Sequence, residues 1–172
     1  MTRILYATAY GSTQQYAEEL ARRLGVEAET IEGVDAATLR GSDPMIVLSY
    51  THGPTLPAAS FIADNDLGNR PLAAVAVGMS RPENARKRDQ IRQMLGPFAA
   101  QVQRIYLPGR MHYSELTDKH HSMMRMIITM LSMKPGKTDN DRAMVEEYNT
   151  DVDRVDVAEL DPVVEWAQAH GA

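Results

Sequence analysis

The sequence contains no cysteine, and this absence excludes several kinds of chemistry. A chain without thiols forms no disulfide, no zinc–thiolate site and no cysteine nucleophile. Any redox reaction must therefore come from a bound cofactor. The chain also has no excess of positive charge. Its formal net charge is -5, which disfavours nucleic acid as a partner.

Long apolar runs are also absent. No run reaches the ~18 residues that a transmembrane helix needs. An apolar strand begins within a few residues of Met1, which leaves no room for a signal peptide. We therefore expect a cytoplasmic protein, and peripheral contact with the inner face of a membrane stays open as an alternative.

The chain has 172 residues, and 44% of them are hydrophobic. We expect a single domain, residues 1–172, which is large enough to bury a core without disulfide bonds or a structural metal ion. Short apolar runs alternate along it with segments of helical periodicity. This alternation is typical of an α/β fold with a parallel sheet covered on both faces. The predicted strands are 4–7, 26–31, 44–49, 71–78 and 103–107, and the first three predicted helices are 14–24, 56–63 and 83–95.

A last helix is predicted near the end of the chain. Asp161 is expected to cap it, with Pro162 at its first position. Its inward stripe is predicted to be Leu160, Val163, Val164 and Ala167.

The first strand stops in a turn rich in hydroxyl groups, residues 8–13. Thr8, Ser12 and Thr13 provide hydroxyls, Gly11 lies among them, and a helix follows at once. The free N–H groups and positive dipole end of a helix N-terminus attract anions, and no acidic residue in the turn repels one. We predict a phosphate site here. The simpler alternative is a turn in which Ser12 or Thr13 caps the helix and nothing binds.

A family pattern runs through the same residues. The spacing of Ile4-Leu5-Tyr6, Thr8, Gly11, Thr13 and Ala17 resembles the flavodoxin signature, which cradles the 5′-phosphate of FMN. The resemblance implies FMN as cofactor and a flavodoxin-like fold, a doubly wound five-stranded parallel sheet in the order 2-1-3-4-5. The phosphate would be held by Thr8, Ala9, Tyr10, Gly11, Ser12 and Thr13.

Two further loops follow buried strands of the predicted sheet. In such sheets ligands bind beyond the carboxyl ends of the strands, where the winding reverses, a rule for which flavodoxin itself is a standard example. The resemblance therefore implies that these loops enclose the isoalloxazine ring of FMN. One side would be lined by Ser49, Tyr50, Thr51, His52 and Gly53, and the other by Gly78, Met79, Ser80 and Arg81.

About forty residues, 113–155, separate the last predicted strand from the last helix, more than a simple connection needs. We expect a helical insertion. Its centre, 120–134, is apolar around most of a helix and holds five of the eleven methionines. Three interpretations are open: a helix packed on the domain with methionine as filler, a homodimer interface, or a lid that contacts a flat apolar substrate, a quinone, a redox partner protein or a membrane. Residues 134–142, rich in charge, are predicted to form a solvated loop.

The sequence of the insertion resembles one particular group of flavodoxin-like proteins. Gly109-Arg110 with Tyr113, the methionine-bearing helix and the run 130–139 are similar to the flavodoxin-type protoporphyrinogen IX dehydrogenases, which carry an insertion at this place. This implies an FMN-dependent oxidoreductase that oxidises protoporphyrinogen IX or a similar apolar substrate and passes electrons to a quinone. Arg81 or Arg110 would grip a propionate carboxylate. The alternatives are a flavodoxin-type electron carrier without a substrate of its own and a flavin-free interaction domain.

No side chain stands out in the sequence as an essential acid or base, so the catalytic residues stay unassigned. His112, His120 and His121 are close in the chain, but the adjacent pair points to helical faces about 100° apart. No carboxylate completes a ligand pattern with them. No metal site is predicted.

Overall fold

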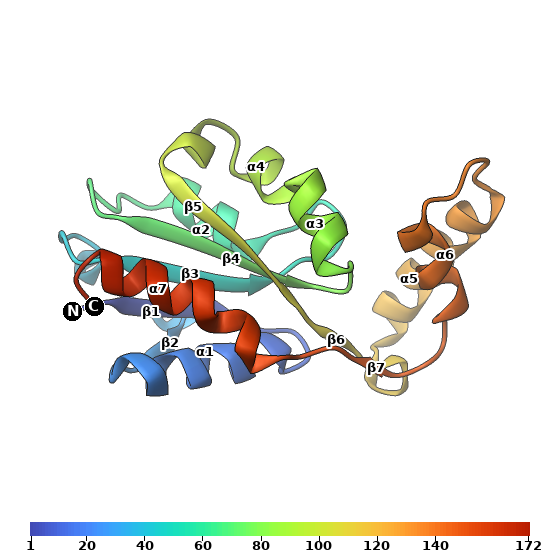
Figure 1. The fold of residues 1–172 in the computed structure, drawn as a ribbon, viewed down its shortest axis with the longest axis horizontal. Coiled ribbons are helices and arrows are strands. Elements are labelled where there is room, and N and C mark those ends of the chain that lie inside the picture. The colour runs from blue at the N-terminus through green and yellow to red at the C-terminus, as the bar shows by residue number, and fades with distance from the viewer.

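The computed structural model describes the whole chain, residues 1–172. Five parallel strands form its central sheet, in the order β2-β1-β3-β4-β5 (Figure 1). This is the predicted doubly wound sheet, and the prediction is confirmed. The strands are β1 (Arg3–Ala7), β2 (Ala28–Thr30), β3 (Met45–Tyr50), β4 (Leu72–Gly78) and β5 (Val102–Pro108).

Seven α-helices and a second, two-stranded sheet complete the chain. β6 (Arg110–Met111) and β7 (Val152–Asp153) pair in antiparallel fashion. None of the helices has both the length and the apolar character needed to cross a bilayer. The helices are α1 (Ser12–Leu24), α2 (Pro57–Asp64), α3 (Pro82–Arg88), α4 (Gln90–Leu95), α5 (Asp118–Met133), α6 (Asp139–Glu146) and α7 (Asp161–Ala169).

The main sheet buries a separate apolar layer on each face. Ile4 lies in the layer under α1 and α7, and its neighbour Leu5 lies in the layer under α2 and α4. Figure 1 shows these helices on opposite sides of the sheet. Because successive side chains of a strand point to opposite faces, a strand covered on both sides must be apolar at every position. This explains the uninterrupted apolar runs 45–48 and 72–77.

The predicted helix 83–95 is wrong as a single element. It is divided at Asp89, whose φ of 42° lies in the left-handed region and ends α3. The turn brings the Asp89 carboxylate to Arg104 of β5, whose guanidinium donates to it at 2.9 Å. The break therefore anchors this helical segment to the edge strand of the sheet.

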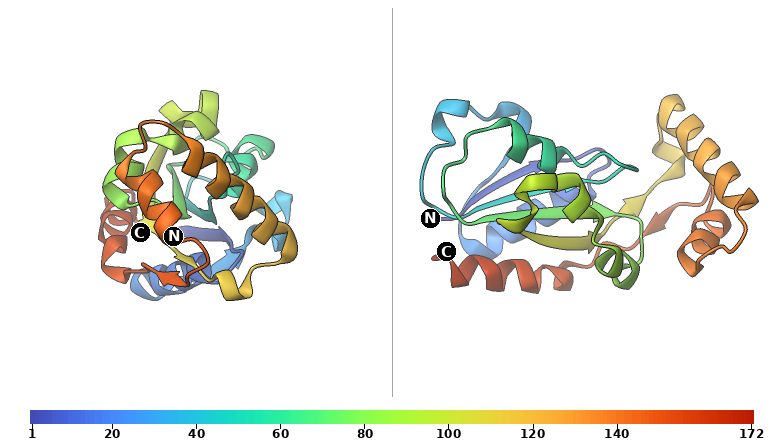
Figure 2. Two further views of the ribbon diagram at one scale, coloured as in Figure 1. Left: turned by 90° about the vertical axis from the view of Figure 1, so that its right-hand side faces the viewer. Right: turned by 90° about the horizontal axis from the view of Figure 1, so that it is seen from above.

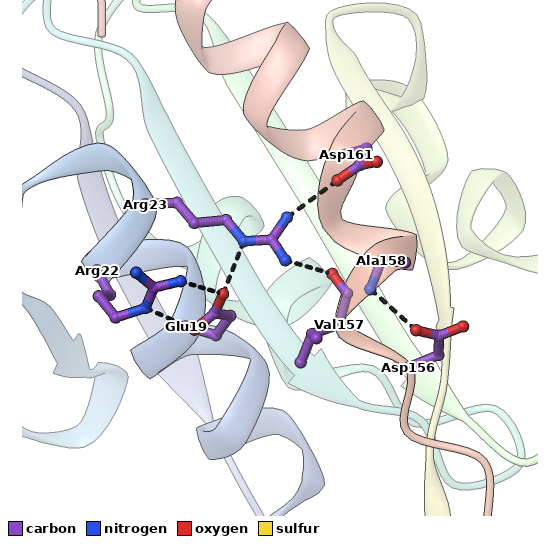
Figure 3. Close-up of polar contacts among 7 residues, drawn as sticks. All are labelled: Glu19, Arg22, Arg23, Asp156, Val157, Ala158 and Asp161. Carbon is purple, nitrogen blue, oxygen red and sulfur yellow. Dashed lines mark hydrogen bonds and ion pairs between the residues drawn. The ribbon is translucent and has the colours of Figure 1, made fainter.

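The predicted cap at Asp161 is also wrong. A 3₁₀ turn, Val157–Leu160, runs directly into α7, so Leu160 occupies the cap position and Asp161 is the first helical residue. The Asp161 carboxylate instead accepts from Arg23 of α1 at 3.0 Å (Figure 3). The predicted inward stripe is confirmed for its fully buried members, Leu160, Val163 and Ala167.

Two side chains of α1 join it to the C-terminal segment. The Arg23 guanidinium donates to Glu19, to the carbonyl of Val157 and to Asp161 (Figure 3). The buried Tyr16 hydroxyl donates to the Pro108 carbonyl at 2.7 Å and accepts from the Asp156 N–H at 2.9 Å. These contacts position the start of α1, where the phosphate site is predicted, against the end of β5.

The insertion, residues 113–155, lies beyond the carboxyl ends of the strands (Figures 1 and 2). The short strands β6 and β7 connect it to the sheet, and α5 packs against α6. The predicted loop 134–142 is wrong beyond its first half, because α6 begins at Asp139. The Thr138 hydroxyl accepts from the Asp141 N–H while the Asp141 carboxylate accepts from the Thr138 N–H, a capping box that starts the helix.

Candidate functional site

The turn between β1 and α1 leaves several hydrogen-bond donors without an acceptor. Gly11 has a φ of +82°, a conformation that residues with a side chain rarely adopt. Its N–H donates to the Thr8 hydroxyl at 3.1 Å, which closes the turn. Helix α1 has no side-chain cap and no acidic residue in its first turn. Gln15 is the first residue whose N–H bonds to the turn, at Gly11, so the N–H groups of residues 12–14 have no acceptor within the chain.

One buried hydroxyl in this turn lacks a partner. Thr13 is 1% exposed, and its Oγ1 makes no hydrogen bond. A buried polar group without a partner costs roughly 1–3 kcal/mol. Together with the free N–H groups, this hydroxyl supplies donors that an oxyanion would satisfy. The residues therefore fit the phosphate group of FMN.

The two predicted ring loops lie against each other at the carboxyl edge. The Thr51 N–H donates to the Val77 carbonyl at 2.9 Å, which extends the β3–β4 pairing into the loops. Gly78 is required there, because a Cβ at this position would lie 2.6 Å from Thr51 Cγ2 and 3.1 Å from the Tyr106 hydroxyl. Gly78 therefore allows the two loops and β5 to pack closely at this edge.

A cavity of about 320 Å³ lies between this edge and the insertion. The sheet side is formed by the predicted residues Ala9, Tyr10, Ser12, Tyr50, Thr51, His52, Gly53, Gly78, Met79 and Ser80. The opposite wall comes from β6, α5 and α6 and is largely apolar, with Met111, Met123, Met124, Ile127, Leu131 and Met144. An apolar pocket with a few polar groups at one edge is the usual form of a cofactor site.

Five predicted site residues lie outside this cavity. Thr8, Gly11 and Thr13 belong to the phosphate turn beside it. Ser49 is fully buried, and its hydroxyl accepts from the Ala58 N–H at 3.0 Å, which ties β3 to the start of α2. Arg81 is exposed and is not part of the cavity wall.

The structure adds residues that sequence reasoning did not place at the site. Arg88 and Gln90, next to the break between α3 and α4, reach the cavity. Arg110, which the sequence indicates as a candidate for binding a propionate, also lines the cavity and is held by Asp153 at 3.0 Å and by the Gln15 side chain at 2.6 Å. Only the break at Asp89 could have indicated the first two, and it is a tertiary feature.

Four rings from three separate segments form a cluster at one end of the cavity. The ring centroids of Tyr50 and His52 are 4.7 Å apart, and those of His52 and His120 are 5.4 Å apart. The Tyr10 hydroxyl hydrogen-bonds His120 Nδ1 and so links the phosphate turn to α5. The sequence indicates His120 only as a candidate metal ligand, because its distance along the chain from Tyr10 hides this contact.

Burial lowers the pKa of the His52 imidazole, and the neighbouring His120 lowers it further. The environment of His52 therefore disfavours its charged form. His121 lies elsewhere, edge-on to Tyr113 at 6.0 Å, and His112 Nδ1 lies 3.5 Å from a Glu115 oxygen.

Comparison with known families agrees with this geometry. A family model described as a flavodoxin domain matches residues 3–141. The chain belongs to the flavodoxin domain family. No curated protein and no solved structure matches it. Flavodoxin domains commonly bind FMN, so membership indicates an FMN-binding redox function.

Proposed function

We propose that this flavodoxin-domain protein is an FMN-dependent oxidoreductase that oxidises a flat apolar substrate, protoporphyrinogen IX or a compound like it, with a quinone as electron acceptor. The observation that carries the proposal is the cavity with a methionine-rich wall beside the phosphate turn. A protein that only carried electrons would need its flavin edge accessible to partners. Here apolar side chains of the insertion line the cavity opposite the carboxyl edge of the sheet, where the flavin would bind.

The residues divide the binding of FMN between them. The Thr13 hydroxyl and the N–H groups of residues 12–14 would hold the phosphate, and the loops 50–53 and 78–80 would hold the ring. When bound, FMN supplies the two-electron transfer that the cysteine-free chain lacks. The chain positions the ring and keeps water from it with the apolar wall.

Two arginines that line the cavity, Arg88 and Arg110, suit an acidic substituent on the substrate. Arg88 makes no hydrogen bond or ion pair within the chain, and Arg110 is already oriented by Asp153. Guanidinium groups bind carboxylates in bidentate geometry. These two arginines are therefore placed to bind a propionate while methionine side chains contact the apolar body.

The volume of the cavity limits what enters at one time. Pockets for small molecules span roughly 300–1,000 Å³, and 320 Å³ is room for one flat ring system. A second flat molecule requires the insertion to move away from the sheet. The insertion suits such a movement, since β6 and β7 and a few polar contacts connect it to the rest of the chain.

The test is a titration of purified protein with FMN, followed by turnover measurements. Flavin absorbance should shift on binding, and the Thr13→Val variant should bind FMN at least tenfold more weakly. Thr129→Val is the matched control, because Thr129 lies on the exposed side of α5 and donates to the Arg125 carbonyl. Equal FMN affinity in the two variants would refute the phosphate assignment.

The proposed substrate is tested in turnover measurements with the FMN-loaded protein. Oxidation of protoporphyrinogen IX with menadione should exceed the rate with free FMN, and Arg88→Met should raise KM more than it lowers kcat. A protein that binds FMN but accelerates no such oxidation, and that a reductase reduces in a salt-sensitive manner, would be an electron carrier. A protein that takes up no FMN would be an interaction domain.

A further inference from the structure

His52 differs in its acid–base chemistry from the other titratable side chains that line the cavity. The other titratable groups that line the cavity are Tyr10, Tyr50, Arg88, Arg110 and Asp141. Tyrosine and arginine titrate far above neutral pH. The ion pair with Lys134 lowers the pKa of Asp141 to about 2. Histidine alone among them exchanges a proton between pH 5 and 8.

The backbone and ring of His52 are held in place, yet its nitrogens are free. The His52 N–H donates to the Thr55 carbonyl at 3.1 Å, and the Thr55 N–H donates back at 3.0 Å. Gly53, with a φ of +56°, allows this tight turn. The ring packs between Tyr50 and His120. Neither ring nitrogen makes a hydrogen bond within the chain, so both are available to a ligand.

His120 restricts the protonation of His52 without itself lining the cavity. The Tyr10 hydroxyl and His120 Nδ1 share a hydrogen bond, which holds the His120 ring beside His52. The Tyr10–His120 pair therefore fixes one face of the His52 ring and keeps a second titratable ring beside it. A proton added to His52 meets few counter-charges there, which favours its onward transfer.

We propose that His52 is the group that exchanges protons with the substrate in this cavity, and that His120, held by Tyr10, is its positioning residue. The proposal rests on the proposed oxidoreductase function. Oxidation of an N–H and C–H substrate releases an electron pair and two protons, and reduction of a quinone to a hydroquinone consumes the same number. The C–H hydrogen would leave with the electron pair as a hydride, which bound FMN would accept and deliver to the quinone. The N–H bond breaks with its proton passing to a His52 ring nitrogen, and that proton then passes to the quinone oxygen or to water.

The first experiment needs no cofactor. An NMR titration of histidine side chains in the flavin-free protein should show His52 titrating below the usual value near 6.5. His120→Gln should raise that midpoint, since the neighbouring charge is removed. His121→Gln is the matched control on the same helix and should leave the midpoint unchanged. A His52 ring that does not titrate between pH 5 and 8 would overturn the proposal.

The second experiment uses the FMN-loaded protein. His52→Gln keeps a polar side chain but cannot exchange a proton, and kcat should fall about 100-fold or more. The acid limb of the kcat/KM profile should disappear, and kcat should stay low when the variant is saturated with FMN. Unchanged kcat with the acid limb retained would refute the role, as would weakened FMN binding with normal kcat, which indicates a structural residue. Failure of all variants and the wild type to bind FMN would instead refute the oxidoreductase function, and the flavin-free titration would still report on His52.

Discussion

Under α1 and α7 the sheet buries whole side chains, and Leu20, Leu48 and Leu160 are all inaccessible to solvent. The corresponding apolar cluster at the insertion has only three buried members, Met111 of β6 together with Tyr113 and Met124. Three methionines on the outer side of α5, Met126, Met130 and Met133, are 58–80% exposed. The sheet is held by extensive apolar burial, whereas a small apolar cluster and a few polar contacts hold the insertion.

The difference matters for the site, because the cavity lies between the two regions. One wall belongs to a rigid sheet edge, and the other belongs to helices attached through β6 and β7. Local opening of a protein begins where few apolar contacts must be broken. We therefore expect the insertion to open without unfolding of the sheet. Contact of the exposed methionines with a membrane, a second copy of the chain or a partner protein remains a proposal.

The largest effect is expected in the sheet. Leu48→Ala should lower the free energy of unfolding by about 2–5 kcal/mol, because it leaves a cavity in a layer that cannot collapse. Met126→Ala, on the exposed side of α5, should change it by less than about 0.5 kcal/mol. Denaturant unfolding followed by circular dichroism measures both. Equal losses would contradict the comparison between the regions.

The next effect tests the link between α1 and the end of β5. Tyr16→Phe leaves the Pro108 carbonyl and the Asp156 N–H without their partner, which should cost about 1–3 kcal/mol of unfolding free energy. Burial raises the pKa of Tyr16 to about 12, so the loss should not vary between pH 6 and 9. Tyr148→Phe is the control, since that hydroxyl makes no hydrogen bond within the chain. Unchanged unfolding in both variants would show that water replaces the Tyr16 contacts.

A third change should act on the insertion alone. Arg154 donates to the Met79 carbonyl at 3.2 Å and pairs with Glu147, so it joins the ring loop to the end of α6. Arg154→Met should increase hydrogen exchange in α5 and α6 about tenfold or more, with exchange in β3 and β4 unchanged. Arg142→Met, which removes an exposed ion pair with Asp139, is the control and should have little effect. Faster exchange throughout the sheet would mean that the two regions open together.

The smallest effect depends on pH. The Lys134 ammonium and the Thr138 N–H lower the pKa of Asp141 from 3.8 to about 2. Since the folded value is depressed, this contribution to the capping of α6 is fully present above about pH 3.8 and is lost as the pH falls through 2. NMR of the α6 amides between pH 6 and 2 should show this loosening. Asp141→Asn should loosen α6 already at neutral pH and flatten the response, and an unchanged profile would exclude the carboxylate as its cause.

Much of the fold could be predicted because the relevant patterns are local. The strands are apolar at every position where both faces are covered, and the turn 8–13 carries its hydroxyls and glycine within six residues. These features arise from periodicity and from the needs of a helix N-terminus, which the neighbouring residues determine. The strand order followed from the resemblance of this turn to the flavodoxin signature, and the family match and the structure agree with it.

Features that depend on contacts between residues far apart in the sequence were decided only by the tertiary structure. The break at Asp89 is accompanied by its pairing with Arg104, and Asp161 is used by Arg23 of another helix instead of capping its own. The ring cluster that includes His52 joins segments that are up to 110 residues apart, at Tyr10 and His120. No local pattern encodes such a contact, because its geometry exists only once the insertion lies across the carboxyl edge of the sheet.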